Sequence, residues 1–378
     1  MIISQYLYED ENWTCFKKAK HGKGNKIIFV FADRFLLEKN EPIRYLKEKF
    51  PSADIVSSST SGDFLGTTLS SDNTLCATVV EFSKSHYKAK AFKSSDYKKC
   101  DLLGIDITNY FSEKGLKHIL LFSEGTTVNG SFLTEGINQL FRDKISVTGG
   151  LAGDGNRFKK TIVGLNEDFS QDYVVAVGLY GQDLEIGFGH SCAFESFGLL
   201  RKVTKSIDNV LHEIDGKPAL SLYKEYLGEH AQFLPESALW FPLEISKTKT
   251  SSPFVRTILG IDEDKNTMTF AGNVPEGSFI RLMRSNIQDI LASAEDSANA
   301  SKIGNPESEG LALLISCVGR RSILKDRTEE ELEEVRDILP ANMILSGYYS
   351  YGELSSKKET KGCDLYNQTM TITTLRED

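Results

Sequence analysis

Three loops of this sequence end in a glycine followed by an acidic residue, and these pairs are well suited to binding chemistry. The acids are Asp63, Asp154 and Glu353, after Gly62, Gly153 and Gly352. Glycine allows a backbone to turn with positive φ and to approach a ligand closely. The carboxylate could bind a ligand ammonium group, while backbone N–H groups of the loop bind a carboxylate. The structural alternative is that each acid caps a turn. Repetition favours a ligand site, although a duplicated turn would repeat as well.

The second of these loops contains the most candidate ligand groups. Its glycines are Gly149, Gly150 and Gly153, and Arg157 follows Asp154 by three residues. The loop lacks the Lys-Ser/Thr pair of a phosphate-binding P-loop, and its glycine spacing differs from the Rossmann fingerprint. Arg157 would either hold an anionic ligand group in a bidentate manner or pair with Asp154 at the surface. We favour the ligand role for this loop.

The third loop adds aromatic and cationic candidates. Tyr349 and Tyr351 would share one face of a strand and could form an aromatic wall beside Glu353. Such a wall suits an organic cation through cation–π contact, but plain core packing is an equally good explanation. Arg320, which follows an apolar strand, is a candidate partner for a ligand carboxylate.

Cysteine and histidine chemistry gives two further alternatives. Cys317 precedes two arginines, which would favour a reactive thiolate, but no base lies beside it and a free cysteine is usually a core residue. The six histidines show no metal-binding spacing, so we expect no metal site. Haem needs only one axial histidine, and His190 is the candidate for that role.

The candidate loops follow a strand–helix–strand unit that occurs three times. The first strands cover residues 26–31, 118–122 and 311–315, and an amphipathic helix leads from each to a second strand and its loop. Pro42 suits a first helical turn, and Thr328 with Glu331 predicts a capping box. Another strand follows each loop, at residues 77–82, 173–179 and 370–375. Strands flanking helices in this way predict an α/β fold with βαβ units.

Composition limits the classes of partner. The 378 residues include 44 Lys+Arg and 53 Asp+Glu, which gives a net charge of −9. This balance argues against nucleic acid or anionic membranes as main partners. The six cysteines are scattered, and no apolar run approaches the roughly 20 residues of a membrane span. We expect a cytoplasmic protein without membrane insertion.

Several separated motifs, taken together, resemble the FIST family of sensory proteins. The motifs lie at residues 57–63, 149–154, 203–206, 214–228, 314–320, 347–353 and 366–369. The resemblance implies two related sandwich-like halves with mixed sheets, a FIST N-like domain at 1–190 and a FIST C-like domain at 191–378. It also implies a sensor for an amino-acid-like metabolite that acts in trans on a histidine kinase, a chemoreceptor or a cyclic-dinucleotide enzyme. Some relatives resemble haem-binding nitric-oxide sensors.

We therefore predict a ligand-binding sensor and not an enzyme, without a cofactor. Haem binding through His190 and nucleophilic catalysis by Cys317 are the alternatives, and a pure interaction scaffold is a third. Asp63 could be the structural copy among the three acids. The predicted ligand-binding residues are Asp63, Gly149, Gly150, Gly153, Asp154, Arg157, Arg320, Tyr349, Tyr351 and Glu353.

Overall fold

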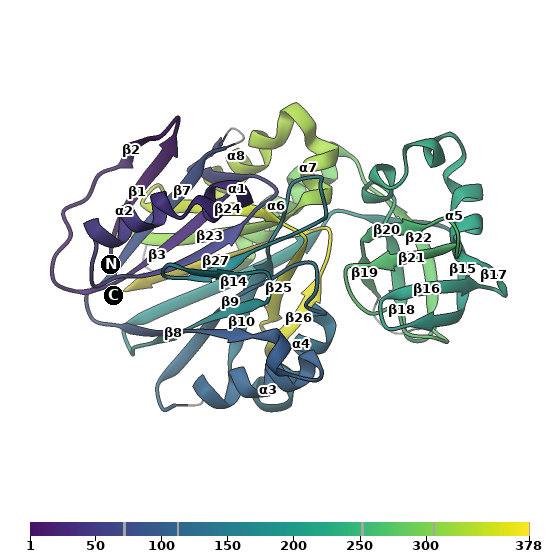
Figure 1. The fold of residues 1–378 in the computed structure, drawn as a ribbon, viewed down its shortest axis with the longest axis horizontal. Helices are drawn as coiled ribbons and strands as arrows, with labels where there is room; N and C mark the ends of the chain where they lie inside the picture. The colour runs from purple at the N-terminus through teal and green to yellow at the C-terminus, as the bar shows by residue number, and fades with distance from the viewer. Residues whose placement is uncertain (71–72, 112, 251–252, 305–306, 378) are drawn as a thin grey trace.

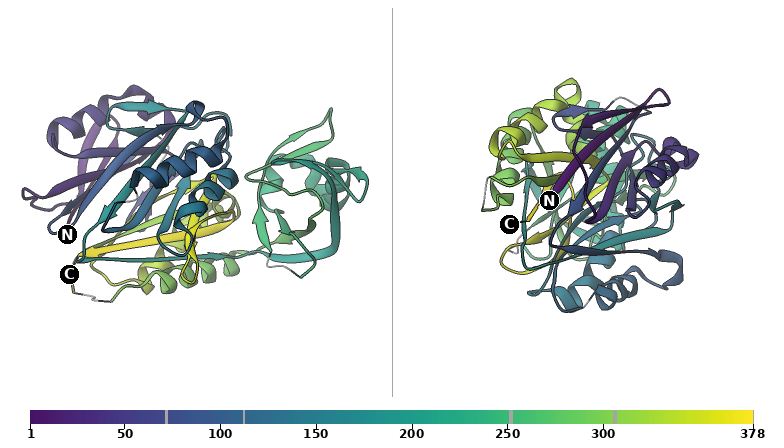
Figure 2. Two further views of the ribbon diagram at one scale, coloured as in Figure 1. Left: turned by 90° about the horizontal axis from the view of Figure 1, so that it is seen from below. Right: turned by 90° about the vertical axis from the view of Figure 1, so that its left-hand side faces the viewer.

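The computed structural model describes residues 1–378 except 71–72, 112, 251–252, 305–306 and 378. It consists of a large body, built from both ends of the chain, and a smaller domain inserted between β14 and α6 (Figure 1). The two termini lie side by side at the end of the body far from the inserted domain (Figure 2). The N-terminal amino group pairs with Glu377 at 3.2 Å.

The body contains three mixed sheets. The first has the order β12 (Asp168–Ser170), β11 (Val163–Leu165), β4 (Asp54–Ser59), β3 (Asn25–Ala32), β7 (Leu75–Phe82), β1 (Ile2–Glu9), β2 (Asn12–Lys17). The second has the order β25 (Gly352–Lys357), β26 (Lys361–Tyr366), β10 (Ser146–Leu151), β9 (Leu116–Ser123), β13 (Tyr173–Tyr180), β8 (His86–Lys93). The third has the order β14 (Leu184–Cys192), β27 (Thr369–Glu377), β23 (Gly310–Cys317), β24 (Met343–Ser350), β5 (Asp63–Leu65), β6 (Thr68–Leu69).

Each sheet is built from one copy of the sequence repeat and completed by a neighbouring copy. The parallel pairs β3/β4, β9/β10 and β23/β24 flank the helices, and β7, β13 and β27 run antiparallel beside them. The hairpin after each parallel pair crosses to another sheet, where β5 pairs with β24, β11 with β4, and β25 with β10. The three repeats are therefore interlocked in a cycle around a shared core that includes Phe31, Phe122, Ile315 and Tyr348.

Helices cover the outer faces of the three sheets and bury one apolar side each. They are α1 (Arg34–Lys39), α2 (Glu41–Lys49), α3 (Cys100–Phe111), α4 (Gly130–Phe141), α6 (Ile287–Ser301), α7 (Val318–Leu324) and α8 (Thr328–Ile338), with 3-10 turns η1 (Ser94–Asp96) and η4 (Lys325–Arg327). Pro42 lies in the first turn of α2, as predicted. The prediction of a capping box at the start of α8 is wrong. Thr328 donates to Lys325 O, and the side chain of Glu331 turns inward to bind Arg320. A buried ion pair thus takes the carboxylate that the local pattern assigned to the backbone.

The inserted domain is a small, strongly curved sheet with its own core. Its elements are β15 (Glu195–Ile207), β16 (Val210–Ile214), β17 (Lys217–Pro218), α5 (Ala219–Leu227), η2 (Gly228–Phe233), η3 (Glu236–Leu239), β18 (Leu243–Ser246), β19 (Phe254–Arg256), β20 (Ile258–Asp262), β21 (Thr267–Phe270) and β22 (Phe279–Arg284). The chain enters and leaves it through two short adjacent segments, where Ser285 Oγ donates to Ala193 O at 2.7 Å.

The predicted α/β class with mixed sheets is confirmed. The domain boundary at residue 190 remains a prediction; it falls inside β14, and β5 and β24 from its two sides pair in one sheet. No helix in the described part of the chain has the length and apolar character needed to cross a membrane.

Candidate functional site

The three Gly-acid loops meet at one place in the body. Backbone hydrogen bonds join them: Ser61 N donates to Tyr349 O at 2.8 Å, Tyr349 N to Gly62 O at 2.7 Å, and Gly153 N to Ser59 O at 2.9 Å. The strands that precede the loops end at this place because the three repeats surround one core. The loops therefore form one shared centre, and protein atoms fill it.

The glycines of the second loop allow this close packing. Gly149 has φ of +152°, and a Cβ there would overlap Leu121 O. A Cβ on Gly150 would lie 2.6 Å from Ile315 Cγ2, and one on Gly153 would overlap the Ser61 side chain. Neighbouring strands and loops thus pack directly against these three glycines.

Asp154 is fully buried and held by two guanidinium groups. Arg157 Nε donates to its Oδ1 at 2.8 Å, Arg34 Nε to the same oxygen at 3.2 Å, and Lys160 N to Oδ2 at 3.2 Å. Arg157 also reaches Asp33 at 2.8 Å. The ion pair between Arg157 and Asp154, which the sequence left as the alternative, is present within this loop. The contacts of Arg34 with Asp154 and of Arg157 with Asp33 tie the loop to the start of α1.

Asp63 and Glu353 are also buried, and neither forms such an ion pair with any residue that the structure describes. Burial raises the pKa of each carboxyl to about 7, against the lowering effect of neighbouring hydroxyls. Thr60 Oγ1 donates to Asp63 at 3.1 Å, and Ser350 Oγ and Thr369 Oγ1 donate to Glu353 at 2.6 and 3.0 Å. The three equivalent acids thus lie in two kinds of environment: Asp154 is salt-bridged, whereas burial favours the protonated form of Asp63 and Glu353.

Arg320 and the tyrosines contact protein groups. Arg320 Nε donates to Glu331 Oε1 at 2.6 Å, and Tyr349 Oη donates to Glu331 Oε2 at 2.8 Å; all three side chains are fully buried. Tyr351 Oη donates to Gly155 O at 3.0 Å, and its ring stacks on Phe158 at 4.6 Å. The carboxylate that Arg320 meets in the fold is therefore that of Glu331.

The cysteine and histidine alternatives also meet closed environments. Cys317 is fully buried at the end of β23, and burial raises the pKa of its thiol well above the usual range, so the thiolate needed for nucleophilic attack is disfavoured. The ring of His190 lies 4.1 Å from the Tyr366 ring, and burial lowers the pKa of His190 to about 4. Because Tyr366 covers this imidazole and Lys357 and Asp364 carry charge nearby, the surroundings do not fit a flat apolar haem.

Cys317 should therefore resist alkylation in the native protein, whereas the exposed Cys15 should react. Peptide mass spectrometry after brief treatment with iodoacetamide at pH 7 measures both residues in one sample. Treatment in denaturant is the control, and it should modify both. Modification of native Cys317 at the rate of Cys15 would contradict the closed environment.

A cleft of about 380 Å³ lies between the body and the inserted domain. The side of the body that carries α4 and β26 faces β19 of the inserted domain across it (Figure 1). Its lining is polar and charged: Ser131, Thr134, Glu135, Asn138, Arg142, Lys247, Pro253, Phe254, Arg256, Asn273, Pro275, Lys357, Asp364, Leu365 and Tyr366. This volume is in the range of roughly 300–1,000 Å³ that is typical of small-molecule sites.

Arg256, at the end of β19, is the buried cation of this cleft. Its side chain is 6% exposed, and its guanidinium donates to Asn273 O, Val255 O and Leu365 O at 3.1–3.3 Å and to Ser131 Oγ at 3.4 Å. All of these acceptors are neutral, and Arg256 forms no ion pair within the described ranges. Burial lowers its pKa to about 10, so it remains charged at neutral pH. The ring of Phe254 lies 4.4 Å from the guanidinium carbon and helps to orient it.

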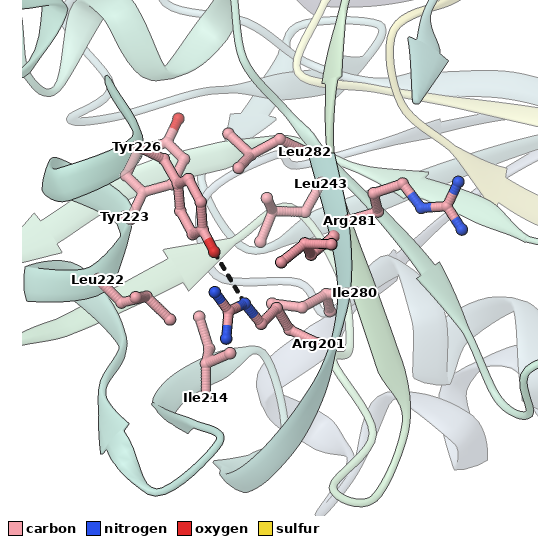
Figure 3. Close-up of a pocket in the computed structure, with 10 residues that line it drawn as sticks. Arg201, Ile214, Leu222, Tyr223, Tyr226, Leu243, Ile280, Arg281 and Leu282 are labelled. Carbon is pink, nitrogen blue, oxygen red and sulfur yellow. Dashed lines mark hydrogen bonds between the residues drawn. The ribbon is translucent and has the colours of Figure 1, made fainter. Parts of the chain in front are cut away.

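Two other hollows are less suited to a polar ligand. One of about 210 Å³ lies beside Phe158, between the body and Leu239 and Ile258 of the inserted domain, and its lining is mainly apolar. The other, inside the inserted domain, is lined by leucines, isoleucines, Tyr223 and the Arg201–Tyr226 pair, whose hydrogen bond is 2.8 Å long (Figure 3). Its volume of about 20 Å³ holds little more than one water molecule.

The sequence did not reveal the residues of the charged cleft. Arg256 follows an apolar pair in what reads as an ordinary strand, and its partners Leu365 and Ser131 are 109 and 125 residues away. Two signals in the sequence were available. One was an arginine inside an otherwise apolar strand, and the other was the separate motif at residues 366–369, which packs against Thr257.

Comparisons with known proteins agree on the domain content. The FIST N domain matches residues 26–217, and the FIST C domain matches residues 219–356. The uncharacterized protein MJ1623 of Methanocaldococcus jannaschii is 26% identical over an alignment of 345 residues, and the match covers 85% of this chain and 65% of the relative. The chain thus spans slightly less than two thirds of that relative's length.

Among solved structures, a cyanuric acid hydrolase from A. caulinodans is similar over 78% of this chain and 99% of its own, at 11% identity and a TM-score of 0.20. A similarity this weak carries no argument about function.

Proposed function

The chain belongs to the FIST family, and we propose that it is a cytoplasmic sensory protein that binds a small, polar, amino-acid-like metabolite in the cleft beside Arg256. FIST domains are small-ligand-binding sensory domains of signal-transduction proteins. The proposed role needs no cofactor and no catalytic group. Its output would pass in trans to a histidine kinase, a chemoreceptor or a cyclic-dinucleotide enzyme, and neither nucleic acid nor membrane insertion is part of the proposal.

The buried guanidinium of Arg256 is the observation that carries this proposal. A charged group taken out of water is costly unless a partner of opposite charge meets it. Arg256 has only neutral acceptors, yet it lines a cleft large enough for a small molecule. A ligand carboxylate would supply the missing anion and would accept two hydrogen bonds from the guanidinium fork.

The other groups of the cleft suit an amino-acid-like ligand. Glu135, on α4, could accept an ammonium group, while Ser131 and Thr134 on the same helix offer hydroxyls. The predicted loop residues then have a supporting role, since the Tyr366–Gln368 turn that borders the cleft leads into Thr369, which donates to Glu353 at 3.0 Å. Gln368 Nε2 donates to Leu239 O and Thr257 Oγ1 of the inserted domain at 3.1 and 3.0 Å. The packed centre would thus hold one wall of the cleft.

Calorimetric titration of the purified protein with a library of amino acids and small carboxylates tests this proposal. We expect at least one ligand to bind, and we expect Arg256→Gln to weaken it about 10- to 100-fold, as for the loss of hydrogen bonds to a charged group. Arg256→Lys keeps the charge but not the two-pronged guanidinium, so its ligand affinity should lie between those of wild type and Arg256→Gln.

Arg284→Gln is the matched control, because Arg284 is an exposed arginine of the same domain outside the cleft. Circular dichroism of each variant verifies that it folds. A folded Arg256→Gln protein with wild-type affinity, or a library without any binding member, would contradict the proposal.

A further inference from the structure

The charges around the cleft indicate more about its ligand than a single carboxylate. Four cationic side chains line it, Arg142, Lys247, Arg256 and Lys357, against the two acids Glu135 and Asp364. The chain as a whole has the opposite balance, with a net charge of −9. Cations are therefore concentrated at this cleft in a protein that is acidic elsewhere, which produces a locally attractive field for anions.

One of the four cations is already neutralised within the protein. Arg142 Nη2 lies 3.1 Å from Asp364 Oδ1, and this pair is about one third exposed on each side. Three cations then remain for one acid, Glu135. Neither Lys247 nor Lys357 forms an ion pair with any residue that the structure describes, and Arg256 has only neutral acceptors.

The two unpaired lysines belong to opposite walls. Lys247 follows β18 of the inserted domain, whereas Lys357 ends β25 of the body. Arg256 lies deeper, against Leu365 and Ser131. A molecule with its first carboxylate on Arg256 would extend toward these lysines at the rim, where a second anionic group would meet cations of both walls.

One further group of the cleft has unused hydrogen-bonding capacity. The hydroxyl of Tyr366 is buried and has no hydrogen-bond partner among the described residues, although it belongs to the lining. The His190 ring packs on the Tyr366 ring at 4.1 Å and fixes its position. A ligand oxygen would satisfy this hydroxyl.

We infer that the ligand is a small dicarboxylate, with one carboxylate on Arg256 and the second between Lys247 and Lys357. This inference rests on the proposed function and narrows its ligand class. The acidic amino acids are the members that would also use Glu135, through their ammonium group. Dicarboxylates without an amino group are the second source of the same chemistry.

Matched acid and amide ligands test the inference. We expect glutamate or aspartate to bind at least ten times more tightly than glutamine or asparagine in calorimetry at low salt. Raising the sodium chloride concentration should reduce this preference, because the rim charges are screened. Succinate and glutarate in the same series show whether the ammonium group contributes: binding equal to that of the amino acids assigns the site to dicarboxylates in general, and weaker binding assigns it to acidic amino acids.

The double variant Lys247→Gln/Lys357→Gln should lower the affinity for the acid far more than the affinity for the amide, because only the acid carries a second charge for the lysines, so the preference for the acid should disappear. Both lysines are exposed, so the fold should tolerate the change. Lys358→Gln, next in the chain and outside the lining, is the control. Equal affinity for acid and amide, or a preference that survives in the double variant, overturns the dicarboxylate inference while the proposed function stands. Absence of binding by every ligand overturns both.

Discussion

Replacing Glu331 by alanine is expected to lower the free energy of unfolding by about 3–5 kcal/mol, because it leaves the charge of Arg320 buried without its partner. Arg320 and Glu331 have no exposed side-chain surface, and Arg320 Nη2 lies 2.6 Å from Glu331 Oε1. Tyr349 Oη and Ser316 Oγ also donate to this carboxylate, at 2.8 and 3.2 Å. One substitution therefore removes the acceptor for three buried donors from α7, β24 and β23.

Chemical denaturation followed by circular dichroism measures this effect. Glu330→Ala is the matched control, because Glu330 precedes Glu331 on α8 and pairs with the exposed Arg327. Exposed ion pairs add little to stability, so the control should unfold close to wild type. Similar midpoints for the Glu331 and Glu330 variants would show that the buried cluster does not stabilise the fold.

The same cluster shows what local sequence patterns can predict. The start of α8 at Thr328 was predicted correctly, because an apolar stripe and an acidic first turn are local signals. The role of Glu331 was predicted wrongly, because its partner Arg320 comes from another helix. A capping-box pattern considers only two residues that are three positions apart, here Thr328 and Glu331. It carries no information about Arg320, which competes for the Glu331 carboxylate.

The architecture was predictable at the level of the repeat but not at the level of the sheets. Alternating strands and helices identified three units, and each contains the predicted strands and helices. The exchange of hairpins between units, such as β5 beside β24, joins residues about 280 positions apart, with Tyr348 opposite Asp63. Strand pairing at this distance depends on how complete repeat units pack against one another, and the hydrophobic pattern within one segment does not specify it. The candidate cleft could not be predicted from the sequence for the same reason, since Arg256 and Leu365 meet only when the inserted domain packs against the body.

Asp63 and Glu353 are expected to make stability depend on pH in the opposite way to salt-bridged acids. Burial raises the pKa of each to about 7, from ordinary values of 3.8 and 4.5. Between these values the folded protein binds a proton that the unfolded chain has lost. The stabilisation is therefore complete below about pH 4 and disappears as the pH rises through 7. Shifts of this size correspond to about 3–4 kcal/mol per group.

Comparing variants with wild type isolates this contribution, because the titration of buried histidines such as His118 cancels in the difference. Asp63→Asn and Glu353→Gln should each be more stable than wild type at pH 8, where a buried carboxylate is ionised, and should lose this advantage by pH 5. Urea unfolding at the two pH values gives the difference directly.

Asp154→Asn is the contrasting control at the third equivalent position. It removes the partner of Arg34 and Arg157, so it should be less stable than wild type at pH 8. If Asp63→Asn and Asp154→Asn change stability in the same direction at pH 8, burial does not raise the pKa of the Asp63 carboxyl. If the two variants instead change stability in opposite directions, the repeated Gly-acid turn supports the packed centre in two ways. One copy uses an ion pair, and the others use a protonated acid. The centre would then hold the wall of the cleft most rigidly well below pH 7, where both acids carry their protons.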